Sequence, residues 1–254
     1  MTLRLEKNGK IAHLLIDRPQ KRNAFTQEMW ELFPKLLADA IEDDSIRVLT
    51  VNASKKDSAF CAGADIGEFG TGSTDPEWRA KNQAAIGKVQ HDLAQAPKPT
   101  IAIIDGDCVG GGCGIALACD MRVAGPKARF GITPAKLGLV YPLHDTKLLV
   151  DAVGPSQAKR ILFTGQILSA EESLRIGLIT ILAEEPYDEA MALAETMASL
   201  SLHSQRMSKT IIKRILDGQV DDDGVSKTLF DSAFESDEFK EGVSAFLEKR
   251  KPEF

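Results

Sequence analysis

The sequence is poor in cysteine, histidine and aromatic residues, and these shortages exclude several classes of protein. Its 254 residues include four histidines, 6% aromatic residues and the cysteines Cys61, Cys108, Cys113 and Cys119. No two cysteines form a C-x-x-C pair, so we predict reduced, buried thiols in a cytoplasmic protein rather than a disulfide framework. No two histidines have the spacing of metal ligands, and we predict no metal site. No run approaches the roughly 18 apolar residues that a membrane-spanning helix needs.

An excess of acidic residues argues against a nucleic-acid partner. The chain carries 31 Lys and Arg against 37 Asp and Glu, a formal net charge of -6 at pH 7. A surface that binds polyanions is therefore not expected over the whole protein. With 43% hydrophobic and 27% charged residues, the composition is globular and excludes disordered, collagen-like and coiled-coil chains. The first seven residues contain no apolar leader segment, so we expect no signal peptide and a cytoplasmic location.

Short apolar runs alternate with helical patterns through the first half of the chain. Three runs rich in β-branched residues are typical of strands buried on both faces: 11–16, 48–53 and 100–105. Residues 26–43 repeat apolar side chains at helical spacing, although Pro34 complicates the middle. A glycine-rich loop at 63–72 and a polar helix at 76–94 are predicted before the third strand. This order predicts an α/β fold with a mostly parallel sheet.

Helical patterns dominate the second half, from Ser169 onward. Five segments begin near Ser or Asp, which suits helix starts: 170–176, 188–200, 204–216, 221–234 and 237–249. The composition changes near residues 154–165, where the sheet core gives way to helices. We therefore predict a core over residues 1–195 and a helical C-terminal part over residues 196–254.

Two glycine-rich segments stand where a strand leads into a helix. The first is residues 60–66; the second is residues 105–120, which contain the consecutive glycines 110–112. Each glycine inside a helix costs about 0.8–1 kcal/mol in propensity, so these glycines must serve another purpose. Glycine lets two backbones approach closely, and a helix N-terminus carries unpaired N–H donors and partial positive charge.

Three interpretations of these glycines remain open. The first is close packing of a helix on a sheet, which needs no side chain. The second, a phosphate loop, is disfavoured because Ile115 replaces the last glycine of Gly-x-Gly-x-x-Gly and no Gly-Lys-Ser/Thr follows. The third is an oxyanion hole, in which amides from both segments hold a developing negative oxygen. Such donors are typically worth about 3–4 kcal/mol each.

Motifs along nearly the whole chain resemble the crotonase (enoyl-CoA hydratase/isomerase) superfamily. The matching pieces, in order, are D-R-P and N-A within 17–24, F-C-A-G-A-D-I at 60–66, G-G-G-C to C-D within 110–120, A-R-F-G at 128–131, V-G at 153–154, I-G-L at 176–178 and the tail at 241–252. Any one piece is weak alone. Their common order makes the resemblance specific.

The resemblance implies a spiral of β-β-α units with a helical C-terminal trimerisation part, acting on an acyl-CoA thioester. The thioester oxygen would accept hydrogen bonds from the amides of Ala64 and Gly111, and these bonds strengthen as the carbonyl becomes an enolate. The residues implied in binding the CoA part are Lys21, Arg22, Ala24, Ala62, Asp65, Ile66 and Gly110. A homotrimer or a dimer of trimers is implied, with no cofactor beyond the coenzyme A of the substrate, no nucleic acid and no membrane.

The sequence departs from the family pattern where hydratases carry their two glutamates. Gly114 and Pro134 stand at those places, and neither residue can move a proton. The aspartate used by dienoyl-CoA isomerases and aryl-CoA dehalogenases of the family falls at Pro142. The standard hydratase mechanism is therefore not predicted.

Tyr141 and His144 are the remaining catalytic candidates near the reacting carbons. The segment from Thr133 to Tyr141 is similar to the methylmalonyl-CoA decarboxylase branch, although that branch can carry a histidine where Ala64 stands here. Tyr141 could orient a carboxylate or supply a proton in a decarboxylation. His144 and Asp145 could form an acid–base pair. Adjacent residues on a helix do not face each other, however, and an exposed first turn is the simpler interpretation.

We therefore predict an acyl-CoA enzyme that works through an enolate, by decarboxylation or isomerisation rather than standard hydration. One alternative is an enoyl-CoA hydratase or isomerase with a relocated acid or base at His144, Asp145 or Glu68. Another alternative is an acyl-CoA-binding protein without catalysis, because both family glutamates are missing.

Overall fold

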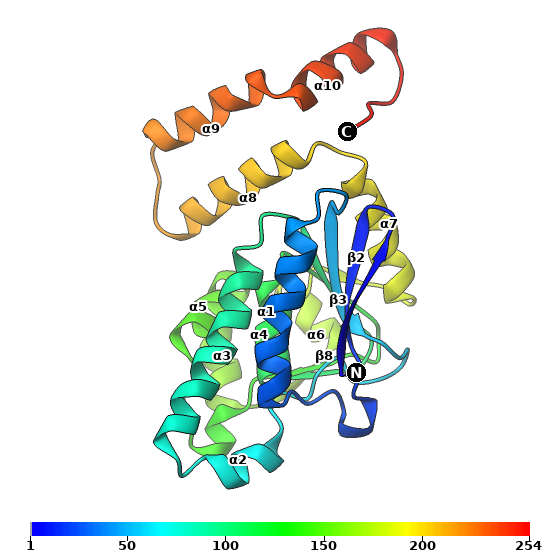
Figure 1. Cartoon of the computed structure of the whole chain (residues 1–254). Helices are drawn as coiled ribbons and strands as arrows, with labels where there is room; N and C mark the ends of the chain where they lie inside the picture. Colours follow the sequence, from blue (N-terminus) through cyan, green and yellow to red (C-terminus); the bar gives the residue numbers. More distant parts are fainter. Residues whose placement is uncertain (1) are drawn as a thin grey trace.

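A six-stranded sheet runs through the core of the protein (Figure 1). The computed structural model describes residues 2–254, with only the backbone at Thr71. The strands in sheet order are β1 (Leu3–Asn8), β2 (Ile11–Ile16), β3 (Val48–Ala53), β4 (Thr100–Ile104), β6 (Met121–Ala124) and β9 (Ile181–Leu182). β1 pairs with β2 in antiparallel fashion, and the other neighbours pair in parallel. The prediction of a mostly parallel sheet is confirmed.

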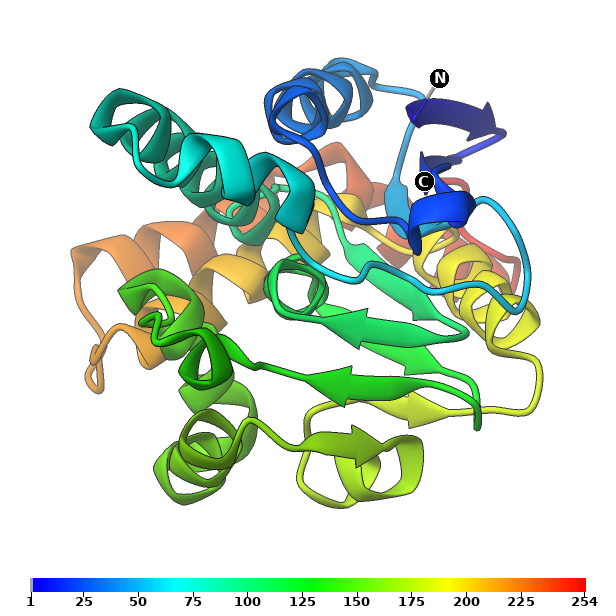
Figure 2. The same cartoon turned by 90° about the horizontal axis from the view of Figure 1, so that it is seen from below.

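A second, smaller sheet makes the fold a spiral (Figure 2). It contains β5 (Asp107–Val109), β7 (Arg129–Gly131) and β8 (Ile167–Ser169), with β5 parallel and β8 antiparallel to β7. The chain passes from β4 to β5 and from β6 to β7, so two turns of the chain each give one strand to each sheet. A helix follows each pair, α4 (Gly111–Ala118) and α5 (Leu143–Thr164). This is the spiral of β-β-α units that the sequence resemblance implies.

The long helix after the first hairpin is continuous despite its proline. α1 (Gln27–Glu42) begins at Thr26, whose hydroxyl accepts a hydrogen bond from the amide of Met29. Pro34 removes one internal hydrogen bond, but the helix buries Trp30 and Phe33 fully. Burial of such aromatic side chains outweighs the local cost, because each is worth a few kcal/mol.

The predicted glycine-rich loop at 63–72 is partly wrong, because its second half is a helix. α2 (Ile66–Gly72) starts at Asp65, whose side chain accepts a hydrogen bond of 2.9 Å from the amide of Gly67. This cap satisfies one of the unpaired donors of the first turn and starts the helix despite its glycine content. The polar helix predicted next is confirmed as α3 (Pro76–Ala94).

The five helices predicted in the second half are all present. They are α6 (Ala170–Arg175), α7 (Pro186–Ala198), α8 (Leu202–Leu216), α9 (Gly224–Glu235) and α10 (Asp237–Glu248). α7 packs on the larger sheet through Ala190, Ala194 and Ala198, whereas α8 to α10 lie beyond the end of that sheet (Figure 1). The division at residue 195 and the trimerisation role remain predictions.

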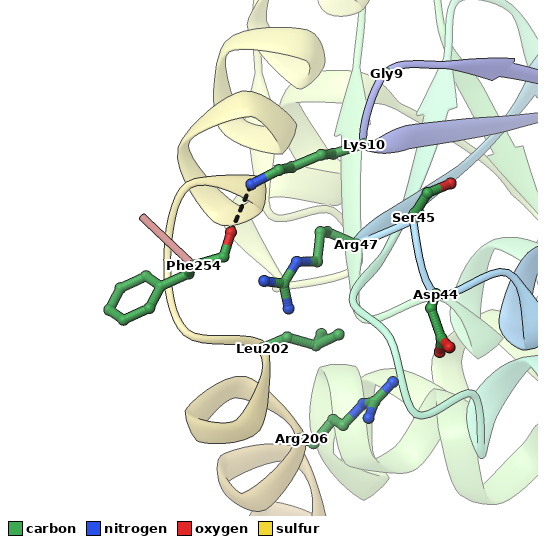
Figure 3. A pocket seen from close by; sticks show the side chains of 8 residues that line it. All are labelled: Gly9, Lys10, Asp44, Ser45, Arg47, Leu202, Arg206 and Phe254. Atoms are coloured by element: carbon green, nitrogen blue, oxygen red, sulfur yellow. Dashed lines mark hydrogen bonds between the residues drawn. The ribbon is translucent and has the colours of Figure 1, made fainter. Parts of the chain in front are cut away.

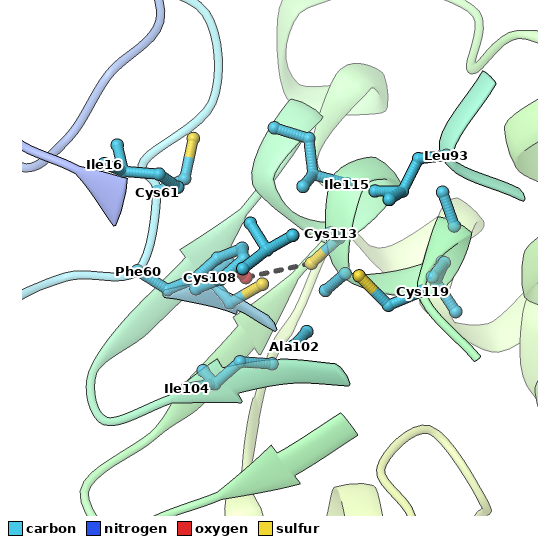
Figure 4. Close-up of a cluster of buried hydrophobic side chains, with 14 of the residues drawn as sticks. Ile16, Phe60, Cys61, Leu93, Ala102, Ile104, Cys108, Cys113, Ile115 and Cys119 are labelled. Carbon is cyan, nitrogen blue, oxygen red and sulfur yellow. Dashed lines mark hydrogen bonds between the residues drawn. The ribbon is translucent and has the colours of Figure 1, made fainter. Parts of the chain in front are cut away.

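The four cysteines lie in the apolar core between α4 and the strands (Figure 4). All are free and buried, and the thiol of Cys113 donates to the carbonyl of Cys108 at 2.9 Å. Burial raises the pKa of the Cys61 and Cys119 thiols to about 12. The prediction of buried, unpaired thiols is confirmed. Over residues 2–254, no helix is both long enough and apolar enough to cross a bilayer.

Candidate active site

The two segments implied in CoA binding lie side by side. The amide of Phe25 donates to the carbonyl of Gly63 at 2.8 Å, and the amide of Asp65 donates to the carbonyl of Phe25 at 2.8 Å. A third bond joins the amide of Ala62 to the carbonyl of Arg22 at 3.0 Å. The structure thus brings the chain around Lys21 to Ala24, including the short 3-10 helix η1 (Pro19–Lys21), against residues 62–66.

The same segment also runs beside β5 and so reaches the start of α4. The amide of Cys61 donates to the carbonyl of Asp107 at 3.1 Å, and the amide of Val109 donates to the carbonyl of Cys61 at 2.8 Å. Two strands that pair in this way carry their following turns to the same edge. The turn at Gly63 and the turn at Gly110 therefore lie next to each other.

Glycine is required where these two turns touch. A Cβ atom on Gly63 would lie 3.1 Å from the carbonyl oxygen of Val109 and 3.4 Å from the amide nitrogen of Gly111. Gly63 also has a φ of +94°, a conformation that L side chains rarely adopt. A Cβ on Gly111 would lie 3.1 Å from the Trp30 ring. A side chain at Gly63 would push the turns apart, whereas one at Gly111 would require only a small shift of the Trp30 ring.

The structure places the predicted oxyanion donors in adjacent turns with their hydrogen atoms available. Within the described residues, neither the amide of Ala64 nor that of Gly111 donates a hydrogen bond. Gly111 is the first residue of α4, where unpaired amides carry the partial positive charge of the helix N-terminus. Gly110 precedes it with φ +56° and turns the chain into the helix. Convergence of both amides on a thioester remains a prediction.

The charged residues implied in CoA binding differ in whether their side chains are paired with other groups of the protein. Lys21 is exposed, and exposed Arg22 forms an ion pair with Asp107. Asp65 is engaged by Arg18 at 2.7 Å as well as by the α2 cap, and hydrogen bonding to Arg18 lowers the pKa of its carboxyl. The Asp65 side chain therefore has a structural role, while its neighbour Ile66 is 73% exposed.

Other side chains fill the space beside Gly114, where the sequence resemblance predicts that hydratases carry a glutamate. A Cβ on Gly114 would lie only 2.0 Å from Nε2 of Gln90 and 3.4 Å from Oδ2 of Asp145. These groups reach the space from α3 and α5, the helices on either side of α4. The second place, Pro134, begins the short 3-10 helix η2 (Pro134–Leu137) and offers no proton-transfer group.

The exposed first turn of α5 expected around Asp145 is wrong, because the Asp145 side chain is only 2% exposed. The carboxyl points inward and lies beside Gly114 of α4. Burial raises the pKa of Asp145 to about 6, and His144, with Nδ1 3.5 Å from Oδ1, opposes part of that rise. The sequence names Asp145 as a candidate acid or base but gives no sign of Gln90, because Gln90 belongs to no recognisable motif.

The two side chains predicted as catalytic near this point have different surroundings. The Tyr141 hydroxyl is buried without a hydrogen-bond partner among residues 2–254. Burial, followed by the charge of Asp145, raises the pKa of Tyr141. The His144 ring lies 5.9 Å from that of His91, and both line a cavity of about 800 Å³ between α3, α5 and α8. Tyr141 therefore belongs to the surroundings of Asp145, whereas His144 faces this cavity.

A second cavity, drawn in Figure 3, lies beside the residues that follow the C-terminal end of α1. It measures about 570 Å³ and is lined by the basic side chains of Lys10, Arg47 and Arg206 together with Asp44. Lys10 donates to the carbonyl oxygen of Phe254 at 2.7 Å. α1 is 16 residues long, or about 24 Å, so this cavity is separate from the candidate active site. Nowhere in the described chain do three or more His, Cys, Asp or Glu residues come together so as to hold a metal ion.

Known proteins match this chain over its full length. The enoyl-CoA hydratase/isomerase family model matches residues 6–254. An enoyl-CoA hydratase/isomerase family protein from Hyphomonas neptunium has a crystal structure that aligns with a TM-score of 0.96 at 38% identity, covering 100% of this chain and 97% of that chain. A crotonyl-CoA hydratase from Syntrophomonas wolfei is 34% identical over 254 residues, 98% of this chain and 96% of that protein. The chain therefore belongs to the enoyl-CoA hydratase/isomerase family.

Proposed function

We propose that this protein acts on an acyl-CoA thioester through an enolate held by the amides of Ala64 and Gly111. The supporting observation is the contact between their two turns, in which both amides lack an acceptor among the described residues. Donors fixed in this way stabilise the enolate oxygen more than the ground-state carbonyl, so they accelerate the reaction. Exposed Lys21 and Arg22 beside the turns suit the phosphates of coenzyme A.

We further propose isomerisation or decarboxylation rather than standard hydration. Addition of water needs one group to activate the water and another to protonate the adjacent carbon. Gly114 and Pro134 supply neither group. Moving a double bond needs a single group that takes and returns a proton, and decarboxylation needs no base. None of these steps transfers electrons to a carrier, so we propose no cofactor beyond the coenzyme A of the substrate.

The reaction class is tested with a panel of CoA esters that includes 3-enoyl, 2-enoyl, malonyl-type and aryl thioesters. We expect turnover of a 3-enoyl or malonyl-type ester and slow or no hydration of crotonyl-CoA. Efficient hydration would instead favour a hydratase with a relocated acid or base, the function named for the relative from Syntrophomonas wolfei. Binding of several esters without any product would favour an acyl-CoA-binding protein.

The oxyanion role is tested by removing one amide. Gly111→Pro deletes the N–H, whereas Gly111→Ala keeps the N–H and brings the same Cβ against Trp30. We expect Gly111→Pro to lower kcat by about 10²–10³ relative to Gly111→Ala. Thermal melting and binding of a CoA ester verify that both variants fold. Equal turnover by the two variants would exclude the assigned role.

We also propose a cytoplasmic homotrimer or dimer of trimers that assembles through α8 to α10. Large apolar side chains are exposed along these helices: Ile212, Ile215, Phe230, Phe234 and Phe246. Exposed apolar surface of this extent marks a protein interface. Light scattering should give three or six times the 27.6 kDa chain mass, and Phe230→Asp should reduce it. A monomeric wild type would contradict this assembly.

A further inference from the structure

Buried polar groups gather around Gly114. Among the described residues, the buried Asp145 carboxyl interacts with the side chains of His144 and Gln90, whereas Oη of Tyr141 is buried without a hydrogen bond. Native proteins leave few such groups, because each one costs stability unless something completes it. The Tyr141 hydroxyl is left without a partner beside the Asp145 carboxyl, so we expect a polar group of the substrate to complete this cluster.

This polar site adjoins the proposed oxyanion donors. Gly114 lies three residues after Gly111 on α4, which places the two residues on neighbouring positions of the helix surface, about 4.5 Å apart along its axis. Oδ2 of Asp145 lies 3.4 Å from where a Cβ of Gly114 would be. The carboxyl group therefore lies against α4 at the residue that is about one helical turn after the amide proposed to hold the thioester oxygen. The acyl carbons next to that oxygen span such a distance.

Glycine at position 114 leaves room for the Gln90 side chain. A Cβ there would lie 2.0 Å from Nε2 of Gln90 and would displace it, whereas the Asp145 carboxyl would be in ordinary contact at 3.4 Å. Gln90 is itself only 1% exposed, and α3, α4 and α5 pack against one another at this point. The packing fixes both side chains, as proton transfer requires of its donor and acceptor.

We propose that Asp145 is the catalytic acid–base of this protein, with Gln90 as a positioning residue, in the isomerisation of a 3-enoyl thioester. This inference rests on the proposed enolate chemistry. The Asp145 carboxylate takes a proton from carbon 2, the C–H electron pair forms a double bond to carbon 1, and the carbonyl pair moves onto the oxygen. When the carbonyl re-forms, the double bond between carbons 3 and 4 takes the proton back at carbon 4. The product is a 2-enoyl thioester, and the carboxylate is regenerated.

The surroundings of Asp145 suit both halves of this step. Burial raises the pKa of its carboxyl to about 6. At neutral pH the carboxylate form predominates and can accept a proton, and the protonated form is close enough in free energy to return it. The titratable groups around it are His144 on α5, His91 on α3, Tyr141 before α5 and Cys113 on α4. We expect kcat/KM to fall as the pH decreases below about 6, by a factor of ten per unit.

The test compares wild type, Asp145→Asn and the control Asp151→Asn, which removes a carboxylate from the same helix. Asp151 forms an ion pair with Lys147 at 2.7 Å and lines the cavity between α3, α5 and α8. Exchange of the carbon-2 hydrogens of butyryl-CoA in D₂O is followed by mass spectrometry, and 3-enoyl-CoA conversion by absorbance. We expect Asp145→Asn to lower both rates by about 10²–10⁴ and Asp151→Asn to leave them unchanged. Gln90→Met should move the acidic limb of the pH profile to higher pH rather than abolish turnover, because the interaction with Gln90 lowers the pKa of Asp145.

The outcomes separate this inference from the proposed function. Exchange by wild type that Asp145→Asn retains in full would overturn the role of Asp145 and leave the enolate chemistry intact. No exchange and no turnover by wild type would overturn both proposals. Butyryl-CoA binding by Asp145→Asn verifies that the site is folded. A wild-type pH profile without a limb near pH 6 would also count against Asp145.

Discussion

Replacing Asp145 by Asn should make the protein more stable, and the gain should depend on pH. The folded state holds the Asp145 proton more tightly than the unfolded state does, because burial raises the pKa from 3.8 to about 6. The folded state is therefore favoured below about pH 4 and loses stability as the pH rises toward 6. Asn is nearly isosteric and has no charge to bury, so the variant escapes this loss.

The size of the effect follows from the shift. A change of roughly two pKa units corresponds to about 3 kcal/mol at 1.4 kcal/mol per unit. The carboxyl is almost fully buried, so solvent screening does not reduce this figure much. We expect no gain at pH 4, a rising gain between pH 4 and 6, and a gain of about 3 kcal/mol above pH 7. For a chain of this size, that is about 6–12 °C in Tm.

Urea denaturation of both proteins at pH 4, 5, 6, 7 and 8 measures this difference. Apart from His144, which interacts with the Asp145 carboxyl, the other titrating groups are common to the two proteins and largely cancel. A fixed protein concentration keeps any assembly constant. A pH-independent difference, or a loss of stability that grows toward pH 8, would refute the reasoning. A stability gain together with a loss of carbon-2 exchange would show that the buried carboxyl is kept for function at the expense of stability.

Two further substitutions test the packing that supports the site. Gly112→Ala should lower the free energy of unfolding by about 1–3 kcal/mol or more, because its Cβ would lie 2.4 Å from the carbonyl oxygen of Cys61; an unchanged urea midpoint would contradict this close approach. Lys98→Met should cost about 1–3 kcal/mol, because buried Nζ of Lys98 donates to the carbonyls of Ala40 (3.0 Å) and Asp43 (2.7 Å) at the end of α1. Unaltered thermal melting of this variant would show that those carbonyls find other donors.

The spacing of apolar residues, together with the residues that begin and end helices, predicts most of the helices and strands. The β-branched runs at 11–16 and 48–53 form strands, and the helices after Ser169 appear with their ends shifted by at most three residues. α2 was missed because three glycines in seven residues hide a helical pattern that a single Asp65 cap restores. These are local properties, and the chain carries them in neighbouring residues.

The sequence also predicts the family and the positions of the two glycine turns. The motifs around Ala64 and Gly111 identify which backbone segments matter, because glycine marks the places where two backbones touch. The sequence does not predict the direction in which the Asp145 side chain points. Adjacent residues on a helix point in different directions, and nothing in the local pattern shows which of His144 and Asp145 turns inward.

The sequence by itself determined the family and the order of the elements, because contiguous residues carry the family motifs and the helix and strand patterns. It also predicts that the two hydratase glutamates are replaced by Gly114 and Pro134. Only the tertiary structure decided that Gln90 and Asp145 share the space above Gly114. That space exists because α3, α4 and α5 pack together at a residue without a side chain. Gln90 and Asp145 are 24 and 31 positions away from Gly114 along the chain, so no local sequence pattern shows that they meet there.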